Sequence, residues 1–263
     1  MLRAFSTAAT GMAAQQMLVD VTANNLANIN TNGFKRSQVD FQDLMYVKVL
    51  EANRQVATGL NAPTGFEVGN GVRPASTLRV QEQGQFTNTG RDLDLAIEGE
   101  GFLQISLPNG ETRYTRDGSL RTNANGDLVN ASGYFIEPRI TFPPDTQSIS
   151  IGSDGTVTVM VGGSDTPQQL GQIQLARFPN ETGLSAEGRN LLRETAASGP
   201  AEVGVAGTEG FGTVQQSFLE KANVQMVSEL VNLITAQRAY EINGRVIKAG
   251  DGMLTTANRL LGG

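Results

Sequence analysis

The chain of 263 residues contains no histidine and no cysteine. The absence of histidine excludes His-based catalytic triads, histidine general bases and histidine metal ligands. The absence of cysteine excludes disulfides, thiolate nucleophiles and Cys-based metal sites, although it does not identify the compartment. The sequence therefore lacks the two residue types that most clearly signal catalytic or metal chemistry.

Charge and long apolar runs are also scarce. Charged residues make up 17% of the chain and its net charge is −6, without a run of Lys and Arg, which argues against a nucleic-acid partner. No apolar run approaches the ~18 residues of a membrane span. Near the start, Ser6, Thr7 and Thr10 interrupt the apolar core that a cleaved signal peptide needs. We expect neither stable membrane insertion nor an ordinary secretion signal.

A seven-residue repeat dominates the C-terminal end. Large residues recur at Met226, Leu233, Tyr240, Ile247, Leu254 and Leu261. A second line on the same face is mostly small and comprises Glu229, Ala236, Asn243, Gly250 and Ala257. Such a repeat predicts a helix that packs in a left-handed coiled coil, with small residues allowing close approach of the partner. Asn223, or the capping box of Ser217 and Glu220, are the candidate helix starts.

The N-terminal end carries a weaker version of this pattern over residues 2 to 26. One stripe of mostly apolar or small residues, interrupted by Gln16, alternates steps of three and four: Leu2, Phe5, Ala9, Met12, Gln16, Val19, Ala23 and Leu26. Between Ala4 and Phe34 the only charged residue is Asp20. This predicts a helix contacted on several sides, the alternative being an amphipathic helix packed once. Gly33 is the expected end of the helix.

Between the two helical ends the pattern changes twice. Residues 34–50 fit a short helix or an extended arm, and 51–72 show no periodicity, as in a linker or a segment that folds against a neighbour. From 78 to 178 short alternating runs are separated by turn dipeptides such as Asn109-Gly110, Asp117-Gly118 and Asn125-Gly126. We therefore predict an α+β protein with terminal coiled-coil helices (1–33 and 223–263), an extended linking segment (34–77) and an inserted antiparallel all-β domain (78–222).

Residues suited to chemistry are few. Asp92 and Asp94, beside Glu98, are paired acids that suit acid–base catalysis or a cation, but alternation with Leu93 and Leu95 is typical of the polar face of a half-buried strand. No phosphate-binding or dinucleotide-binding glycine motif occurs. The sequence predicts no catalytic residues, no cofactor and no metal site, and hence no enzyme.

The asparagine-rich run after the first helix resembles a known signature. Residues 22–28 (TANNLAN) with 31–36 (TNGFKR) are similar to the N-terminal signature of bacterial flagellar rod and hook proteins, and residues 229–243 are similar to their C-terminal signature. Between them, 71–74 (GVRP), 99–102 (GEGF) and 114–119 (YTRDGS) match one subgroup of the family, the distal rod proteins. The resemblance extends over nearly the whole chain, in order.

This resemblance implies a structural subunit that polymerises with copies of itself into a rigid helical tube, which transmits torque and passes export substrates through its lumen. The implied location is the basal-body rod that spans the periplasm. Implied partners are the proximal rod protein, the hook protein, the P-ring and L-ring proteins and the flagellar type III export apparatus. Alternatives are a proximal rod or hook protein, or a periplasmic carbohydrate-active β domain with an acidic pocket at Asp92, Asp94 and Glu98.

Two sets of residues follow as candidate functional positions. The assembly interface is expected at Leu2, Phe5, Met12, Val19, Leu26, Met226, Leu233, Tyr240, Ile247, Leu254 and Leu261. By the resemblance, the segment that makes a distal rod rigid is expected around Tyr46, Pro63, Gly65 and Gly69.

Overall fold

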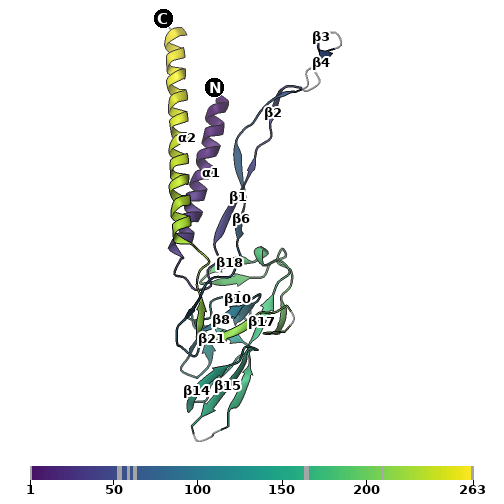
Figure 1. The fold of residues 1–263 in the computed structure, drawn as a ribbon, viewed down its shortest axis with the longest axis vertical. Helices are drawn as coiled ribbons and strands as arrows, with labels where there is room; N and C mark the ends of the chain where they lie inside the picture. The colour runs from purple at the N-terminus through teal and green to yellow at the C-terminus, as the bar shows by residue number, and fades with distance from the viewer. Residues whose placement is uncertain are drawn as a thin grey trace. The chain divides into compact units, whose positions relative to one another are not determined.

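The computed structural model describes residues 2–51, 55–57, 60–61, 64–162, 166–208 and 210–261. The chain divides into two compact units (Figure 1). Unit 1 combines Met1–Leu26, Ser37–Leu78 and Gln225–Gly263, and unit 2 combines Ala27–Arg36 and Arg79–Val224. The chain therefore crosses between the units at four points, and residues 27–36 belong with the β-rich unit. None of the described helices is long and apolar enough to cross a membrane.

Unit 1 contains the two predicted helices, α1 (Leu2–Ala27) and α2 (Met226–Leu261). Helix α1 ends six residues before the expected stop at Gly33. The side chain of Asn25 accepts a hydrogen bond from the Ser37 backbone N–H (2.9 Å) and donates one to the Ser37 carbonyl (2.8 Å), so it pairs with the returning chain like a neighbouring strand. Gly33 serves a different purpose, because a Cβ there would lie 2.7 Å from the carbonyl carbon of Arg116.

The strands between Ser37 and Arg79 form a long β-hairpin (Figure 1). They exclude the short helix that was one of two expectations for residues 34–50, and they include paired strands within 51–72, where no regular pattern was expected. The strands of the hairpin pair in nested order, β1 with β6, β2 with β5 and β3 with β4. The register places Val47 opposite Val68 and Lys48 opposite Glu67. Pairing satisfies the backbone polar groups of a segment that has no core of its own. The strands are β1 (Ser37–Asp43), β2 (Val47–Leu50), β3 (Gln55–Ala57), β4 (Leu60–Asn61), β5 (Phe66–Val68) and β6 (Val72–Arg79).

Unit 2 is built from antiparallel strands, as the alternating runs predicted. A nine-stranded sheet follows the order β11-β12-β13-β9-β10-β19-β18, with β17 paired to both β9 and β20, and a three-stranded sheet has the order β14-β15-β16. Pairs β21–β8 and β22–β7 complete the unit. The strands are β7 (Phe86–Asn88), β8 (Leu95–Glu98), β9 (Phe102–Ser106), β10 (Thr112–Thr115), β11 (Arg121–Thr122), β12 (Leu128–Val129), β13 (Phe135–Glu137), β14 (Thr146–Ile151), β15 (Thr156–Val161), β16 (Gln168–Gln172), β17 (Gln174–Arg177), β18 (Ser185–Gly188), β19 (Leu191–Arg193), β20 (Glu202–Val205), β21 (Thr213–Gln216) and β22 (Phe218–Glu220).

The turn dipeptides form hairpins with one exception. Gly110 and Gly126 take positive φ values of 81° and 82° between strands that pair with each other. Asp117-Gly118 instead joins β10 to β11, which do not pair with each other. Gly118 is needed there because its Cα packs against the Leu95 backbone, where a Cβ would collide with the Leu95 carbonyl.

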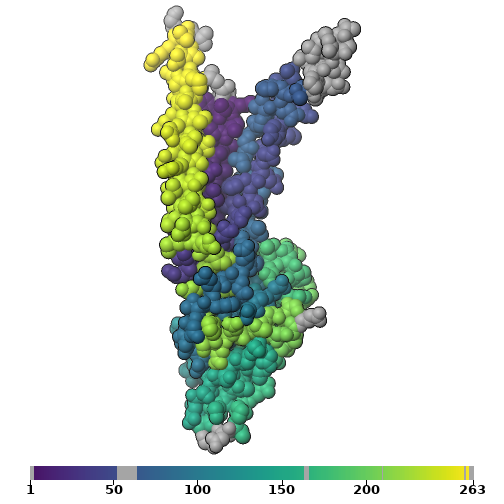
Figure 2. Space-filling view, viewed as in Figure 1, coloured from purple at the N-terminus to yellow at the C-terminus, as the bar shows by residue number. Residues whose placement is uncertain are grey.

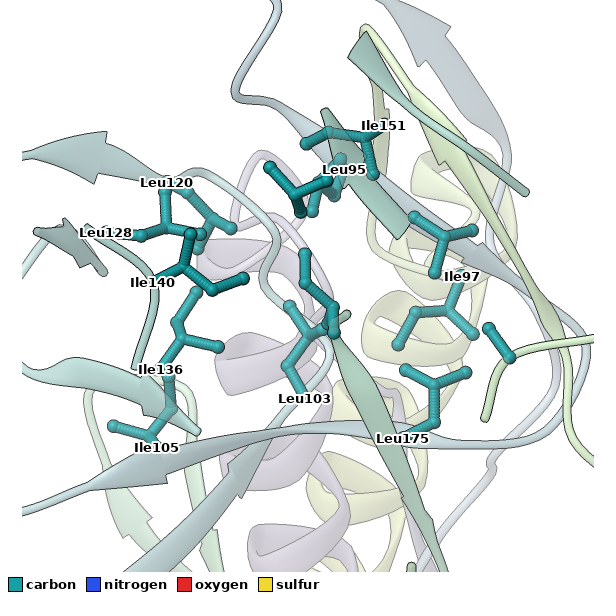
Figure 3. Close-up of a cluster of buried hydrophobic side chains, with 14 of the residues drawn as sticks. Leu95, Ile97, Leu103, Ile105, Leu120, Leu128, Ile136, Ile140, Ile151 and Leu175 are labelled. Atoms are coloured by element: carbon teal, nitrogen blue, oxygen red, sulfur yellow. The ribbon is translucent and has the colours of Figure 1, made fainter. Parts of the chain in front are cut away.

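The core of unit 2 is a cluster of fully buried aliphatic side chains from most of its strands (Figure 3). Leu95 and Ile97 of β8, Leu103 of β9, Ile136 of β13 and Leu175 of β17 are each at most 2% exposed. Side chains from strands far apart in sequence point toward one another, so the cluster binds the sheets into one body. This core gives unit 2 its own source of stability.

Candidate assembly surface and the junction cluster

Helices α1 and α2 lie side by side and run antiparallel (Figure 2). A Cβ on Gly250 would lie 2.8 Å from the Phe5 ring, and one on Gly11 would lie 2.9 Å from the Asn243 side-chain nitrogen. A Cβ on Gly244 would lie 4.0 Å from the Met12 sulfur. From Phe5 to Gly11 and Met12 of α1 the residue numbers of the α2 partners fall, as expected for antiparallel helices. Small residues thus give the close approach that the repeat predicted.

The centre of this contact lies on the small-residue line of α2. Ala236 and Glu229 are 1% and 3% exposed, whereas Met226 and Tyr240 of the predicted large line remain 52% and 43% exposed. Leu233, Ile247 and Leu254 are half-buried. Within the subunit, the small line is therefore the more buried of the two predicted lines, as a tight approach of α1 requires. The assembly contacts expected of the large line stay a prediction.

On α1 the inward face is rotated relative to the predicted stripe. Phe5, Met12, Val19 and Leu26 are half-buried as part of it, whereas Ala9, Gln16 and Ala23 are exposed. The most buried positions are Ala8, Ala14, Thr22 and Asn25. The rotation follows from a second contact, since the hairpin also packs on α1, where Thr10 accepts a hydrogen bond from the Val72 N–H (3.4 Å). Leu2 and Leu261 lie within the helices at their outer ends.

Large apolar side chains are distributed very unevenly between the units. Among the described residues, 18 large hydrophobic side chains are exposed, and 16 of these belong to unit 1. Of the 31 buried hydrophobic residues only Ala8, Ala14, Val39 and Ala236 belong to unit 1. A contiguous exposed apolar surface marks an interaction site. Unit 1 is therefore the candidate assembly surface.

Helix α2 presents two exposed apolar stripes besides the face that contacts α1. Val227, Leu230, Val231 and Ile234 follow the i, i+3, i+4, i+7 spacing of a single helical face near its start. Ile242, Val246, Met253 and Leu260 share another face along the rest of the helix. These two faces have no partner among the described residues of the subunit, so α2 offers apolar contacts in more than one direction.

The hairpin carries a third exposed apolar surface. Met45, Val49, Leu50 and Phe66 are 43–86% exposed. Tyr46 is half-exposed and its ring lies over Gly69, where a Cβ would be 3.4 Å from the ring, so two predicted rigidity residues touch. Gly65 is exposed, and Pro63 lies outside the described residues.

A polar cluster that sequence reasoning missed lies inside unit 2. We call Lys35, Arg116, Glu220 and Asn223 the junction cluster. Lys35 Nζ lies 2.6 Å from Glu220 Oε1, and Arg116 Nη1 lies 3.6 Å from Glu220 Oε2. All three charged side chains are at most 5% exposed. Burial lowers the pKa of Lys35, while the Glu220 carboxylate opposes this shift by favouring the charged ammonium.

The junction cluster overturns the predicted caps of α2. Asn223 accepts a hydrogen bond from the Arg36 N–H (2.7 Å) and donates to the carbonyls of Val80 (2.8 Å) and Glu82 (3.0 Å), so it ties chain segments together three residues before the helix begins. Glu220 is an ion-pair partner, and Ser217 has a φ of 67° that interrupts the last two strands. Lys35 and Arg116 both lie in the family signatures quoted above, but nothing in the sequence indicated that they pair with Glu220.

The acidic pair considered for catalysis does not form a site. Asp92 lies in a turn before β8, while Asp94 is 1% exposed and accepts a hydrogen bond from the Thr89 hydroxyl (2.7 Å). Glu98 is exposed and accepts from the Gln215 amide (2.5 Å). A surface hollow of about 540 Å³ is lined by Leu93, Asn123, Phe142, Pro143 and neighbours, without a carboxylate. The described residues contain no group of three or more acidic side chains that could hold a metal ion.

Comparison with protein families identifies the chain. Sequence models match residues 5–35 (flagella basal body rod protein), 96–159 (flagellar hook protein FlgE/F/G D1 domain) and 215–260 (flagellar basal body rod FlgEFG protein, C-terminal). The flagellar basal-body rod protein FlgG of Caulobacter vibrioides is 49% identical over 98% of this chain and 99% of its own length. FlgG of Borreliella burgdorferi is 46% identical over 99% of both chains, and that of Bacillus subtilis 36% over 97% of both. The chain therefore belongs to the family of flagellar basal-body rod proteins, structural proteins of bacterial motility that lie in the basal-body rod.

Proposed function

We propose that the chain is the subunit of the distal part of the rod, and that copies assemble through unit 1 into a rigid helical tube. The tube transmits torque from the motor to the hook, and export substrates pass through its lumen. The subunit carries out no chemistry of its own and needs no cofactor. The concentration of exposed apolar side chains on unit 1, 16 of 18, is the observation that carries this proposal.

The directions of the apolar faces favour a helical polymer over a closed dimer. One face of α2 is occupied by α1, and the two exposed stripes point elsewhere around the helix. Different faces that each bind a neighbour generate head-to-tail contacts, and such contacts extend into a filament when their rotation does not close. In the tube, α1 and α2 form the coiled-coil inner layer and supercoil around each other and their neighbours.

The hairpin supports the distal rod over the proximal rod and hook alternatives. Its apolar side chains, with Met45 at 86% exposure, gain burial only through another molecule. We assign this surface to a contact with neighbouring subunits that stiffens the rod. Replacing Met45, Val49 and Phe66 by Ser should leave the tube assembled but more flexible in electron micrographs. Unchanged stiffness would favour a hook-like or proximal-rod role.

The same exposure suggests that unit 1 orders fully only on assembly. Helix α2 contains Gly244, Gly250 and Gly252. Each costs about 1 kcal/mol relative to Ala in a helix, and one helix contact offsets only part of the ordering entropy. Amides at 5–25 and 226–258 should therefore exchange fast in the monomer and slowly in the polymer. Strong protection in the monomer contradicts folding on assembly.

The proposed partners follow from the position of a distal rod. The tube contacts the proximal rod protein at one end and the hook protein at the other, with the P-ring and L-ring proteins around it. Delivery by the flagellar type III export apparatus is part of the proposal because the chain belongs to the rod-protein family. Unit 2, which carries its own core, faces outward in this arrangement.

The decisive test is the assembly state of the purified full-length protein. Electron microscopy and light scattering at rising concentration should show tubes, and deletion of residues 226–263 should abolish them while the β-sheet signal of unit 2 persists. A protein that stays monomeric at every concentration overturns the proposal.

A further inference from the structure

Three chain segments of unit 2 lead directly to the crossings into unit 1. Residues 33–36 precede the crossing at 36/37, residues 79–85 follow the crossing at 78/79, and residues 220–224 precede the crossing at 224/225. Any force carried along the chain through these three of the four crossings passes through these segments. How they are held to one another therefore bears on how the subunit transmits load.

The junction cluster connects each of these segments to the other two. Lys35 Nζ donates to the Glu82 carbonyl (2.8 Å) as well as to the Glu220 carboxylate. Glu220 Oε1 also accepts from the Gly84 N–H (2.8 Å). Asn223 bonds Arg36 on one side and Val80 and Glu82 on the other. The side chains of Lys35, Glu220 and Asn223 thus connect the three segments by hydrogen bonds and an ion pair.

Backbone bonds run parallel to these side-chain contacts. The Gly33 N–H donates to the Glu220 carbonyl (2.8 Å), the Val80 N–H to the Arg36 carbonyl (2.9 Å) and the Lys221 N–H to the Gln85 carbonyl (2.9 Å). These three amides report on whether the segments stay together, because their own partners are main-chain atoms that no side-chain substitution removes.

The junction cluster buries charged groups, and this desolvation costs free energy that the ion pairs only partly offset. Four of the five buried side-chain atoms without a hydrogen-bond partner among the described residues lie in or beside it: Gln81 Oε1, Arg116 Nε, Glu181 Oε1 and Glu220 Oε2. Glu181, which feels the charges of Arg116 and Lys35, has its pKa raised by burial. Buried ion pairs commonly add less stability than an apolar replacement of similar volume, whereas they do specify one geometry. Fixing the relative position of the chain segments is therefore a better explanation of the cluster than a gain in stability.

We propose that Lys35, Arg116, Glu220 and Asn223 are positioning residues that lock the three crossing segments in one register, so that the subunit transmits load without slack. The inference rests on the proposed rod function for its consequence, but the locking itself is a property of unit 2. Arg116 contributes by holding Glu220 while its guanidinium stacks on the buried Phe102 ring (5.2 Å).

The test replaces the charges by apolar side chains in the full-length protein, with Lys35→Met, Arg116→Met and Glu220→Leu combined. We expect the denaturation midpoint of unit 2 to be no lower than in the unsubstituted protein, because no buried charge is left unpaired among the three. Hydrogen exchange at the Gly33, Val80 and Lys221 amides should nevertheless become about tenfold faster or more. Tubes of the variant should form and be more flexible.

The matched control removes the same kinds of charge from exposed neighbours, with Lys221→Met and Glu82→Gln. It should leave exchange at the three amides unchanged. Asn223→Ala is the second variant, since it removes three inter-segment bonds without leaving a buried charge, and it should loosen the same amides. If these amides exchange at the original rate in both variants, or if the whole of unit 2 loses protection together, the positioning role is wrong. Failure of the unsubstituted protein to form tubes overturns the rod proposal but leaves the exchange result standing.

Discussion

The two units solve the problem of burying apolar surface in opposite ways. Of the 31 buried hydrophobic residues in the described part of the chain, unit 2 holds 27, including every buried Leu, Ile and Phe, whereas those of unit 1 are three alanines and one valine. In unit 1 the larger apolar side chains lie outside. A sheet-based unit can enclose its own core, but two helices and a hairpin share too little surface to do so. Unit 2 therefore has a hydrophobic core of its own, whereas unit 1 leaves most of its large apolar side chains exposed or half-buried.

Charge divides along the same line. Unit 1 contains eight basic and eight acidic residues, and unit 2 contains twelve basic and eighteen acidic ones, so the net charge of −6 belongs entirely to unit 2. Net charge keeps proteins soluble and apart, while a neutral surface favours close association. The distribution of charge is thus consistent with the proposed assembly through unit 1.

The largest expected effect is the loss of assembly on Leu233→Asp. Leu233 is half-buried on the α2 face that contacts α1, and an unpaired carboxylate there opposes burial. Light scattering and electron microscopy should show no tubes, while the core amides of unit 2 keep their exchange protection. Gln237→Asp, which adds the same charge at an exposed polar position, is the control. Rods of normal length from the Leu233 variant would contradict the assignment of this face.

A pair of truncations measures the contrast between the units directly. Leu103→Ala, at a fully buried position of unit 2, should lower the free energy of unfolding by about 2–5 kcal/mol. Ile234→Ala, at a position 49% exposed on α2, should change monomer stability by less than about 0.5 kcal/mol but raise the concentration needed for assembly. Chemical denaturation and light scattering give the two readings. Equal destabilisation by both would erase the distinction between units.

Substituting alanine for two glycines of α2 should change the stability of the helix differently at the two positions. A Cβ added at Gly252 would meet no atom within 4 Å beyond its own stretch of helix, so Gly252→Ala should increase helix stability by about 1 kcal/mol. Gly250→Ala meets the Phe5 ring at 2.8 Å and should gain less or lose. Circular dichroism of the assembled protein on heating compares the two variants. A larger gain at Gly250 than at Gly252 would show that the Phe5 ring does not pack against Gly250 in the assembly.

The smallest expected effect is a pH dependence within unit 2. Hydrogen bonds from Arg139 hold the pKa of Asp127 well below its ordinary value, so its stabilising contribution is present above that ordinary value and is lost as the pH falls through the lowered one. Glu181 acts oppositely, because burial raises its pKa and its contribution is lost as the pH rises through the raised value. Asp127→Asn should lower the urea midpoint at neutral pH, with a gap that narrows in acid. Asp92→Asn, at an exposed site, should show no such gap.

Periodicity predicted what local patterns determine. The heptad repeat located α2 and its contact face, and the alternating runs with Asn-Gly turns predicted the antiparallel sheets. Prediction from local patterns failed where a residue packs against another that is distant in the sequence. Gly33 ended no helix because its small size accommodates the Arg116 backbone, and Asp117-Gly118 formed no hairpin because Gly118 packs against Leu95. The strand pairing within 37–79 was not predicted, because it joins segments that are distant along the chain and no local pattern records it.

Sequence patterns alone were enough to predict the two terminal helices, the antiparallel strands of unit 2 and the family. These properties depend on residues that are close together in the sequence, so local sequence patterns are enough to predict them. Only the tertiary structure decided that Lys35, Arg116, Glu220 and Asn223 meet, since Lys35 and Glu220 are separated by 185 positions. Burial of a charge is favourable only beside its partner, and that partner is set by the folding of the intervening β unit rather than by any local pattern.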